Sequence, residues 1–241
     1  MTPDVAAALA PTGTLRVAVW RLDYFAVADS AGRLAGIIPD LGNALARRLR
    51  VPVALAAFAT PAAIVAAFHA GDVDVTFLGI TADRADAMCF GPTVVGLQSS
   101  FLVTADSPIT SMEAVAWPGT TIVVPARSAQ EAHLRATHPH ARLLTIPPEA
   151  PGEAIARLAA GDGEAFCHVV PMLAAVQPRL PGSRILPGST FTVPVAIAST
   201  RGRPPAAAAF CRRFAADVKA SGLVADAIAR AGVKGVVVGE P

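Results

Sequence analysis

The sequence is poor in charged and in aromatic side chains. Charged residues make up 16% and aromatic residues 5% of the 241 positions, and the charged share lies below the roughly 25% of an ordinary soluble domain. Lysine is scarce, because 18 of the 20 basic residues are arginine. The net charge of +2 at pH 7 is too small to indicate nucleic acid or an anionic membrane surface as the partner.

Cysteine is also scarce, and its spacing carries no motif. Cys89, Cys167 and Cys211 are widely separated and include no Cys-x-x-Cys pair. An odd number of isolated cysteines predicts neither a disulfide framework nor a zinc site, so we expect buried free thiols.

The first residues lack the basic segment and long apolar segment of a secretory signal peptide. We therefore expect either that such a peptide was removed or that the protein stays in the cytoplasm.

One uncharged run is long enough to cross a membrane. Residues 51–71 contain no charge, and about 20 such residues would span a bilayer. The run divides, however, into an alternating strand pattern and a helix that Thr60 and Pro61 would open. A strand followed by a helix cannot span lipid as a unit. With 52 alanines accounting for much of the hydropathy, the sequence predicts a soluble protein.

Short apolar runs typical of strands alternate with helical patterns along the chain, which predicts an α/β fold with mostly parallel strands. The predicted strands lie at 15–20, 51–57, 73–77, 101–104, 121–124, 143–146, 164–167 and 192–198. The predicted helices lie at 41–49, 61–70, 82–88, 128–137, 153–160, 171–176, 205–219 and 224–231.

Two segments with turn chemistry divide this pattern into two lobes. One segment follows the strand ending at Thr104, and the other is the Pro/Gly-rich stretch 180–189. We expect lobe 1 to comprise 1–104 and 190–241, and lobe 2 to be the inserted segment 105–189. Two crossovers would then form a hinge, with the ligand site in an interlobe cleft. We expect a monomer.

The segment 73–84 carries the sharpest local signal. A strand ends at Leu78 and Gly79, Thr81 is a candidate helix cap, and Arg84 follows in the first turn. Helix N–H groups beside a guanidinium suit a carboxylate. The alternative is a capped surface helix in which Arg84 pairs with Asp83 or Asp86.

The chain resembles the type II periplasmic solute-binding proteins of family 3, which serve amino-acid uptake by ABC transporters. The segments that carry this resemblance are 13–19, 29–36, 40–46, 81–84, 101–103 and 219–224. The resemblance implies a two-lobe binding protein that closes over its ligand. It also implies that Arg84 binds a ligand carboxylate, with Leu78 and Gly79 beside it.

The second lobe departs from the family pattern. In segment 119–131, Arg127 stands where the family has a ligand-contacting glycine, Ser128 keeps one of two hydroxyls, and Ala129 loses the other. We expect Ser128 to cap the following helix and Arg127 to point a second cation toward the ligand. The alternative for Arg127 is a solvated surface position.

The resemblance also points to a missing acid. Val169 stands where the family has the aspartate that binds the α-ammonium group of the ligand, and His168 precedes it. Burying an ammonium group without a counter-charge costs several kcal/mol. We therefore expect a ligand with one or two acidic groups, or one with an uncharged polar part facing His168. A core histidine is the equal alternative.

Aromatic residues concentrate after the first strand, where the family places a ring over the ligand. Trp20, Tyr24 and Phe25 are the candidates, and packing beneath the loop is the alternative. Arg21 and Asp23 could be site groups or a local ion pair.

A metal site at His133, His138 and His140 is disfavoured, because the last two lie in a predicted surface turn. Phosphate-binding, nucleophile-elbow and zinc-protease motifs are absent. Adjacent Cys167 and His168 would point to opposite faces of a strand, which disfavours them as a catalytic pair. We expect no cofactor.

The sequence thus predicts a solute-binding protein for a small organic anion, with an ABC permease as a possible partner. The alternatives are a dehydratase-like enzyme on the same scaffold, with His168 or Asp23 as general acid or base, and a cytoplasmic sensory protein.

Overall fold

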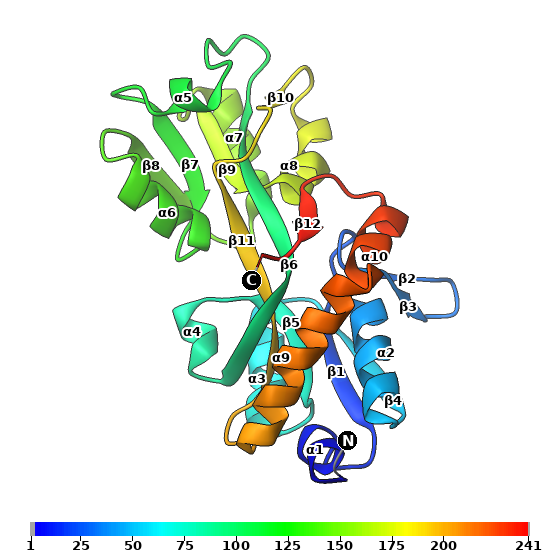
Figure 1. Ribbon diagram of the computed structural model, residues 1–241. Coiled ribbons are helices and arrows are strands. Elements are labelled where there is room, and N and C mark those ends of the chain that lie inside the picture. Colours follow the sequence, from blue (N-terminus) through cyan, green and yellow to red (C-terminus); the bar gives the residue numbers. More distant parts are fainter. Residues whose placement is uncertain (1–2, 241) are drawn as a thin grey trace. The chain divides into compact units, whose positions relative to one another are not determined.

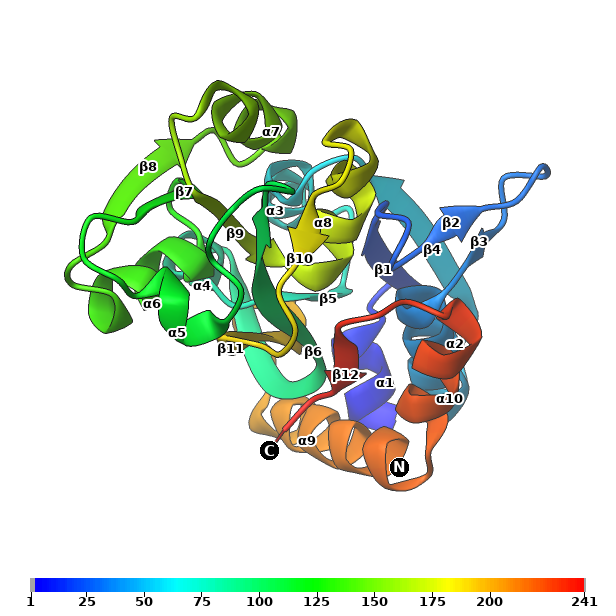
Figure 2. The same cartoon turned by 90° about the horizontal axis from the view of Figure 1, so that it is seen from above.

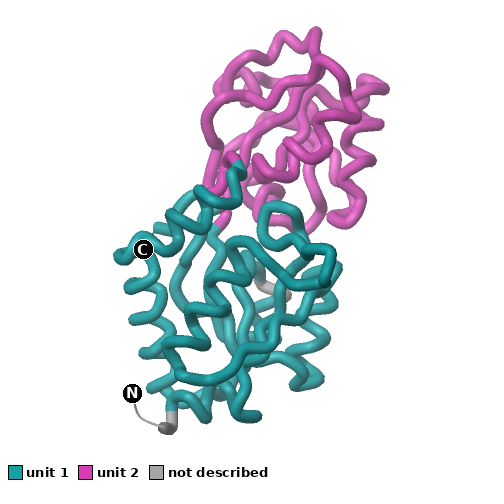
Figure 3. The backbone as a smooth tube through the Cα atoms, turned by 90° about the vertical axis from the view of Figure 1, so that its right-hand side faces the viewer, with its two compact units in different colours: residues 1–96, 194–233, 237–241 teal, residues 97–193, 234–236 magenta. Residues whose placement is uncertain are grey.

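The computed structural model describes residues 3–240, with the side chains of 3, 4, 82 and 83 left aside. The chain forms two compact units, which are coloured separately in Figure 3. Unit 1 comprises Met1–Gly96, Pro194–Val233 and Val237–Pro241, and unit 2 comprises Leu97–Val193 and Lys234–Val236. The change of unit falls inside β6 (Met88–Val103) and β11 (Phe191–Thr200), and again inside the short C-terminal strand β12 (Val236–Val238).

Unit 1 is built on a sheet in the order β4-β1-β5-β11. Strands β4 (Val53–Phe58), β1 (Leu15–Trp20) and β5 (Val75–Gly79) are parallel, and β11 runs antiparallel to β5. Parallel neighbours need crossover connections, which here contain α2 (Ile37–Leu49) and α3 (Pro61–Ala70). The other elements of this unit are α1 (Pro3–Leu9), β2 (Val27–Ala28), β3 (Leu34–Ala35), α4 (Ala82–Ala85), α9 (Pro205–Ala220) and α10 (Leu223–Ala231), with most of β12 (Val236–Val238).

Helices cover both faces of the unit 1 sheet. Figures 1 and 2 show α2 and α3 with β1 between them. Gly42 of α2 packs so closely on β1 that an added Cβ would lie 3.3 Å from Val17. On the opposite face, Ala18 packs with Ile64 and Phe68 of α3. The successive residues Val17 and Ala18 thus serve two different layers, as the twofold period of a strand requires.

Unit 2 is built on the order β6-β9-β7-β8. Strands β9 (Ala165–Val169), β7 (Thr121–Pro125) and β8 (Arg142–Ile146) are parallel, and β6 is antiparallel to β9. The other elements are α5 (Met112–Val115), α6 (Ala129–Thr137), α7 (Pro151–Ala160), α8 (Val170–Val176), the 3₁₀ helix η1 (Gln177–Arg179) and β10 (Arg184–Ile185).

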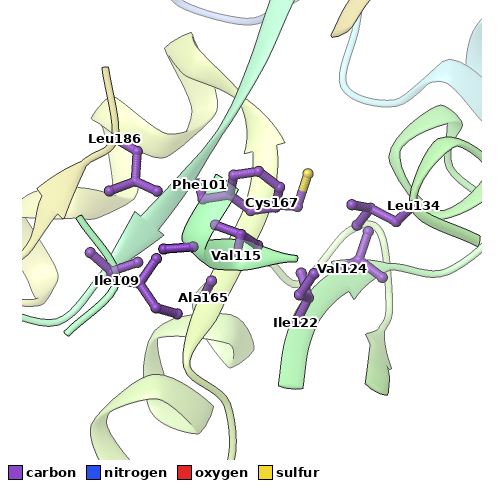
Figure 4. Close-up of a cluster of buried hydrophobic side chains, with 11 residues drawn as sticks. Phe101, Ile109, Val115, Ile122, Val124, Leu134, Ala165, Cys167 and Leu186 are labelled. Carbon is purple, nitrogen blue, oxygen red and sulfur yellow. The ribbon is translucent and has the colours of Figure 1, made fainter. Parts of the chain in front are cut away.

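Alternate residues of these strands supply two cores. Phe101, Val124 and Cys167 lie in the core that includes Leu134 of α6, and Figure 4 shows these side chains converging from β6, β7, β9 and α6. Their neighbours along the strands point to the other core, which includes residues of α7 and α8: Leu102, Val123 and Phe166. The unit 2 sheet is therefore buried on both faces, as is usual for parallel strands joined by helices.

Three local expectations are corrected. The helix expected at 82–88 ends at Ala85, and Met88 already begins the 16-residue strand β6, of which the sequence predicted only 101–104. Cys89 is exposed, whereas Cys167 and Cys211 are buried as expected. Met88 packs in a core beside α3, but the next five residues of β6 are exposed or partly exposed, and continuous burial begins only at Val94.

One buried carboxylate joins four segments of unit 1. Asp74 is 1% exposed and receives two hydrogen bonds from the Arg16 guanidinium, at 2.9 and 3.0 Å, and one from the Arg16 backbone N–H. Arg203 donates to the same carboxylate at 3.3 Å and to the carbonyl oxygen of Ala8. Asp74 therefore ties β1, the start of β5, α1 and the segment before α9 together.

Among the described residues, no helix is both long and apolar enough to cross a membrane.

Replacing Asp74 tests how much this cluster stabilises unit 1. Asp74→Asn leaves two partly buried guanidinium groups without their counter-charge, so we expect a loss of about 3 kcal/mol in the free energy of unfolding. The control is Asp217→Asn, since the ion pair of Asp217 with Arg48 is about half exposed and should contribute less than about 1 kcal/mol. Urea unfolding measures both, and equal losses would contradict a central role for Asp74.

Candidate functional site

The predicted residues of unit 1 lie at the carboxyl ends of its parallel strands. Trp20 ends β1 and pairs with Phe58 at the end of β4, while Gly79 ends β5. Carboxyl ends of parallel strands meet at one edge of a sheet, where ligands of open α/β sheets bind. We call this edge, with the loops that follow it, the unit 1 half-site.

Two of the three predicted aromatic residues are buried in unit 1. Tyr24 is 7% and Phe25 1% exposed, with ring centroids 4.9 Å apart, and burial raises the pKa of the Tyr24 phenol. Trp20 remains partly exposed, and its indole N–H donates to the carbonyl oxygen of Ala59 at 3.2 Å. The packing alternative therefore describes Tyr24 and Phe25 in this structure, and Trp20 is the ring that can still meet a ligand.

A glycine holds the aromatic loop against α2. Gly36 has a φ of 129°, and a Cβ there would lie 2.6 Å from the Phe25 carbonyl oxygen. The same oxygen accepts the backbone N–H of Ile38 at 3.2 Å. Only glycine combines that φ with so close a backbone contact.

Arg84 folds back over the end of β5. Its Nη1 donates to the carbonyl oxygen of Gly79 at 2.7 Å, and Leu78 before it is fully buried. Helix α4 is a single turn that begins after Thr81. The Thr81 carbonyl oxygen accepts the backbone N–H groups of Arg84 and Ala85, but the Thr81 side chain makes no capping bond, contrary to expectation. Arg84 and Gly79 lie together, but the helix that follows is too short for its N-terminal N–H groups to form an anion site beside them.

Arg21 and Asp23 are exposed, and among the ion pairs of the described residues none joins them.

Unit 2 has an equivalent edge, which we call the unit 2 half-site. Strand β7 ends at Pro125, and Arg127 and Ser128 lead from it into α6. Ser128 caps the helix as predicted, because its Oγ accepts the Glu131 backbone N–H at 3.0 Å and donates to the Pro125 carbonyl oxygen at 2.6 Å. Arg127 is exposed and has a φ of 54°. The backbone thus adopts a left-handed conformation, which glycine, the residue that the resemblance led us to expect here, would adopt without strain.

His168 and Val169 lie on opposite faces of β9. His168 shares its face with Phe166, with ring centroids 5.7 Å apart. Its Nδ1 accepts the backbone N–H of Val169 at 2.8 Å, and burial lowers its pKa to about 4. Val169 instead shares the α6 face with Ser99, its partner across the β6–β9 ladder. These contacts tie the imidazole to its own strand, while the side chain remains partly exposed.

Two polar residues beside Val169 went unnoticed in the sequence. Gln130 is 5% exposed and Ser99 fully buried, and the Gln130 amide lies 3.4 Å from the Ser99 hydroxyl. Neutral polar groups therefore lie near the position of the missing acid. Glutamine is common in the first turn of a helix, so the sequence pattern did not mark Gln130 as a site residue. Its burial is apparent only from the packing of α6 on β6.

The histidines of α6 and its following turn do not converge. His133 stacks on Phe191 with ring centroids 4.2 Å apart, and its Nε2 lies 3.3 Å from the Thr190 hydroxyl. The His138 Nδ1 lies 2.8 Å from the Thr137 hydroxyl instead. Among the side chains that the structure describes, no group of three acidic, cysteine or histidine residues is arranged to hold a metal ion.

Of two surface pockets, one lies away from both half-sites and the other borders the unit 1 half-site at Ile80 and Ala85. One of about 620 Å³ is lined by 104–108, 158–161, 163–164 and 180–181, at the amino end of β9. Another of about 370 Å³ lies behind α4, between Ile80, Cys89 and Arg201. The first is at the edge of the unit 2 sheet opposite to the predicted residues, so volume alone does not identify the site.

Because the pKa of His168 is lowered in the folded protein, we expect the free energy of unfolding to depend on pH. Below its unfolded value of 6.5, the unfolded chain binds a proton that the folded chain excludes until about pH 4, so stability falls as the pH falls through this window. The loss contributed by His168 is at most about 3 kcal/mol. We expect His168→Gln to flatten urea-unfolding stability between pH 6.5 and 4. Burial also lowers the pKa of His133 and His138, the latter with help from His133, so some slope remains.

The exposed His140 supplies the control for this measurement. His140→Gln should leave the pH dependence as it is in the wild type. A His168→Gln protein with an unchanged slope would show that the pKa of His168 is the same in the folded and the unfolded chain.

The chain is similar to known proteins over most of its length. The family model of bacterial extracellular solute-binding proteins, family 3, matches residues 16–231. Among solved structures, the ancestral amino acid-binding protein AncCDT-1, a precursor of cyclohexadienyl dehydratase, is 22% identical with a TM-score of 0.67, over 94% of this chain and 98% of that one. The solute receptor for L-cysteine of Neisseria gonorrhoeae is 23% identical with the same TM-score, over 94% and 92%.

An amino acid ABC transporter substrate-binding protein from Streptococcus pneumoniae, bound to L-arginine, is 19% identical with a TM-score of 0.67, over 95% and 97% of the two chains. At these identities the structures establish the fold alone, which is α/β and of the two-lobe solute-binding type. Comparison with curated proteins gives no match. Because the family model covers most of its length, the chain belongs to the bacterial extracellular solute-binding proteins, family 3.

Proposed function

We propose that this solute-binding protein captures a small organic anion, either amino-acid-like or a carboxylate, for uptake by an ABC transporter. One observation carries the proposal: in each unit, arginine and backbone groups selected from the sequence lie at the carboxyl edge of the parallel strands. Gly79 and Arg84 do so in unit 1, and Arg127 and Ser128 in unit 2.

The unit 1 half-site would bind the carboxylate. A guanidinium has five N–H donors arranged to grip a carboxylate with two parallel bonds, so Arg84 can bond to Gly79 and to a ligand together. The bond to Gly79 holds the guanidinium at the end of β5, which reduces the entropy lost on binding. Trp20, partly exposed on the neighbouring strand, would cover an apolar part of the ligand.

The unit 2 half-site would face an anionic or uncharged part of the ligand. The carboxylate of Glu131 in the first turn of α6 is already engaged by the Arg127 N–H at 2.6 Å and the Arg135 guanidinium at 2.6 Å. Gln130, Ser99 and Val169 add no negative charge nearby. A ligand ammonium group would lose its hydration there without an ionic partner.

A binding role is favoured over an enzyme. Of the two sequence candidates for a general acid or base, Asp23 is exposed and His168 accepts the backbone N–H of its own neighbour. The similar solved structures include binding proteins with L-arginine and for L-cysteine, which supports an amino-acid-like ligand.

The family usually functions outside the cytoplasm, so we propose a periplasmic protein, with an ABC permease as its partner and no cofactor. It would act as a monomer with lobe 1 at 1–104 and 190–241 and lobe 2 at 105–189. A cytoplasmic sensory role is the alternative.

Ligand-induced stabilisation tests the carboxylate clamp. We expect succinate to raise the melting temperature in scanning fluorimetry, and L-glutamate, L-cysteine and L-arginine, which carry an ammonium group, to raise it less, since a ligand at 100 times its Kd stabilises the folded state by about 2.7 kcal/mol. Arg84→Ala should abolish the rise, while Arg213→Ala, an exposed change on α9, should keep it.

A second measurement separates binding from turnover. NMR of the bound probe over hours should show it unchanged, and conversion to a product would favour the dehydratase-like alternative. An Arg84→Ala protein that keeps the full ligand response would show that Arg84 does not bind the ligand carboxylate.

A further inference from the structure

The loop before α6 holds an arginine in a backbone conformation that most residues avoid. Among the described non-glycine residues, two have a positive φ, Arg50 at 58° and Arg127 at 54°. Arg50 is the left-handed C-cap of α2, and its N–H donates to helix carbonyl oxygens, an ordinary helix ending. Arg127 instead precedes a helix. Something other than a helix C-cap must therefore hold its conformation, which is strained for a residue with a Cβ.

Glu131 makes the contact that can hold it. The Oε2 atom accepts the Arg127 backbone N–H at 2.6 Å, while Oε1 accepts Nη2 and Nε of Arg135 at 2.6 and 3.1 Å. The Glu131 backbone N–H is in turn bonded to Ser128 Oγ. This is a capping box in which the acid reaches one residue beyond the cap.

Several features make this a strong contact. The Glu131 side chain is 15% exposed, and its pKa is lowered chiefly by the hydrogen bond from Arg135, against the opposing effect of burial, and by the Arg127 N–H. The carboxylate is therefore charged at neutral pH, and hydrogen bonds to an ionised acceptor are shorter and stronger than neutral ones. Arg135 fixes the carboxylate from the other side.

We infer that Glu131 is a positioning residue for ligand binding: it holds the Arg127 backbone in the left-handed conformation and so fixes the point from which the guanidinium reaches the ligand. The inference rests on the proposed function in one respect, that Arg127 contacts the ligand. Without the bond, the backbone of Arg127 gains by relaxing to a negative φ, which turns its Cα–Cβ bond and carries the guanidinium elsewhere. Glu131 would thus govern affinity without touching the ligand.

The chain offers a matched control on α7. Glu153 occupies the same third helical position and pairs with an arginine four residues on, Arg157, at 3.2 Å. Glu153→Ala removes a first-turn acid and an i,i+4 ion pair, as Glu131→Ala does, but leaves the Arg127 loop intact. The two variants should lose similar helix stability.

The first experiment needs no ligand. NMR measures the HN–Hα coupling and the ¹³Cα and ¹³Cβ shifts of residue 127, which report its φ. Glu131→Ala should move these values from the left-handed to the extended range, Glu131→Gln should restore them in part, and Glu153→Ala should leave them unchanged. Left-handed values in Glu131→Ala and Glu131→Gln alike would overturn the inference.

The second experiment measures affinity by calorimetry, with whichever of L-arginine, L-cysteine, L-glutamate and succinate stabilises the wild type. Glu131→Ala should weaken binding roughly 5- to 10-fold with Arg127 present and less than about 2-fold in an Arg127→Gly background, because coupled positions are not additive. Glycine adopts the left-handed conformation freely. The Arg127→Gly background therefore has no guanidinium to position and no strained backbone for Glu131 to hold. Equal losses in both backgrounds would overturn the inference.

The outcomes separate this inference from the proposed function. If Arg127→Gly binds the probe as tightly as the wild type, the proposed contact of Arg127 with the ligand fails. If Arg127→Gly weakens binding and Glu131→Ala does not, the contact stands and the positioning role fails.

Discussion

A buried carboxylate holds together the amino end of the unit 1 sheet, opposite the edge at which the candidate site lies. Asp74 precedes β5, and its bonds to Arg16 and Arg203 gather the chain at the amino edge of the strands. An isolated buried carboxylate would cost many kcal/mol, so the paired arginines are a condition for the fold. Gly79 and Arg84 lie at and beyond the far end of β5, so the candidate site does not include the residues that anchor the amino end of the sheet.

The sequence predicted the elements that carry local signals and missed those that depend on neighbours. Helix α3 matches its predicted range because Thr60 caps it, Pro61 opens it and Gly71 ends it with a φ of 74°. Strand β6 was mostly missed, since Gly91, Pro92 and Gly96 interrupt its pattern and both faces pack only through contacts distant in sequence. A change of unit in the middle of a strand has no turn chemistry, so composition could not locate it.

The same distinction holds for the candidate site. Ser128 was predicted as a cap because capping depends on a few adjacent residues, and the structure confirms that bond. Gln130 and the exposed Cys89 could not be recognised, since burial depends on what packs against a residue. Tyr24 and Phe25 were selected by position after β1, yet the close approach of Gly36 to the Phe25 carbonyl holds their loop on α2. Resemblance located the loops, and packing decided which side chains face outward.

The charge arrangement of unit 2 bears on the proposed ligand. A ligand ammonium would need a nearby carboxylate, but the charge of Glu131 is already shared between the Arg135 guanidinium and the Arg127 backbone N–H. Drawing Glu131 toward a ligand would weaken these charge-assisted bonds and with them the hold on the left-handed backbone of Arg127. In the proposed site, an anionic group would meet Arg127 without that rearrangement. The positive charge is what an arginine adds at a position that glycine would fill with less backbone strain.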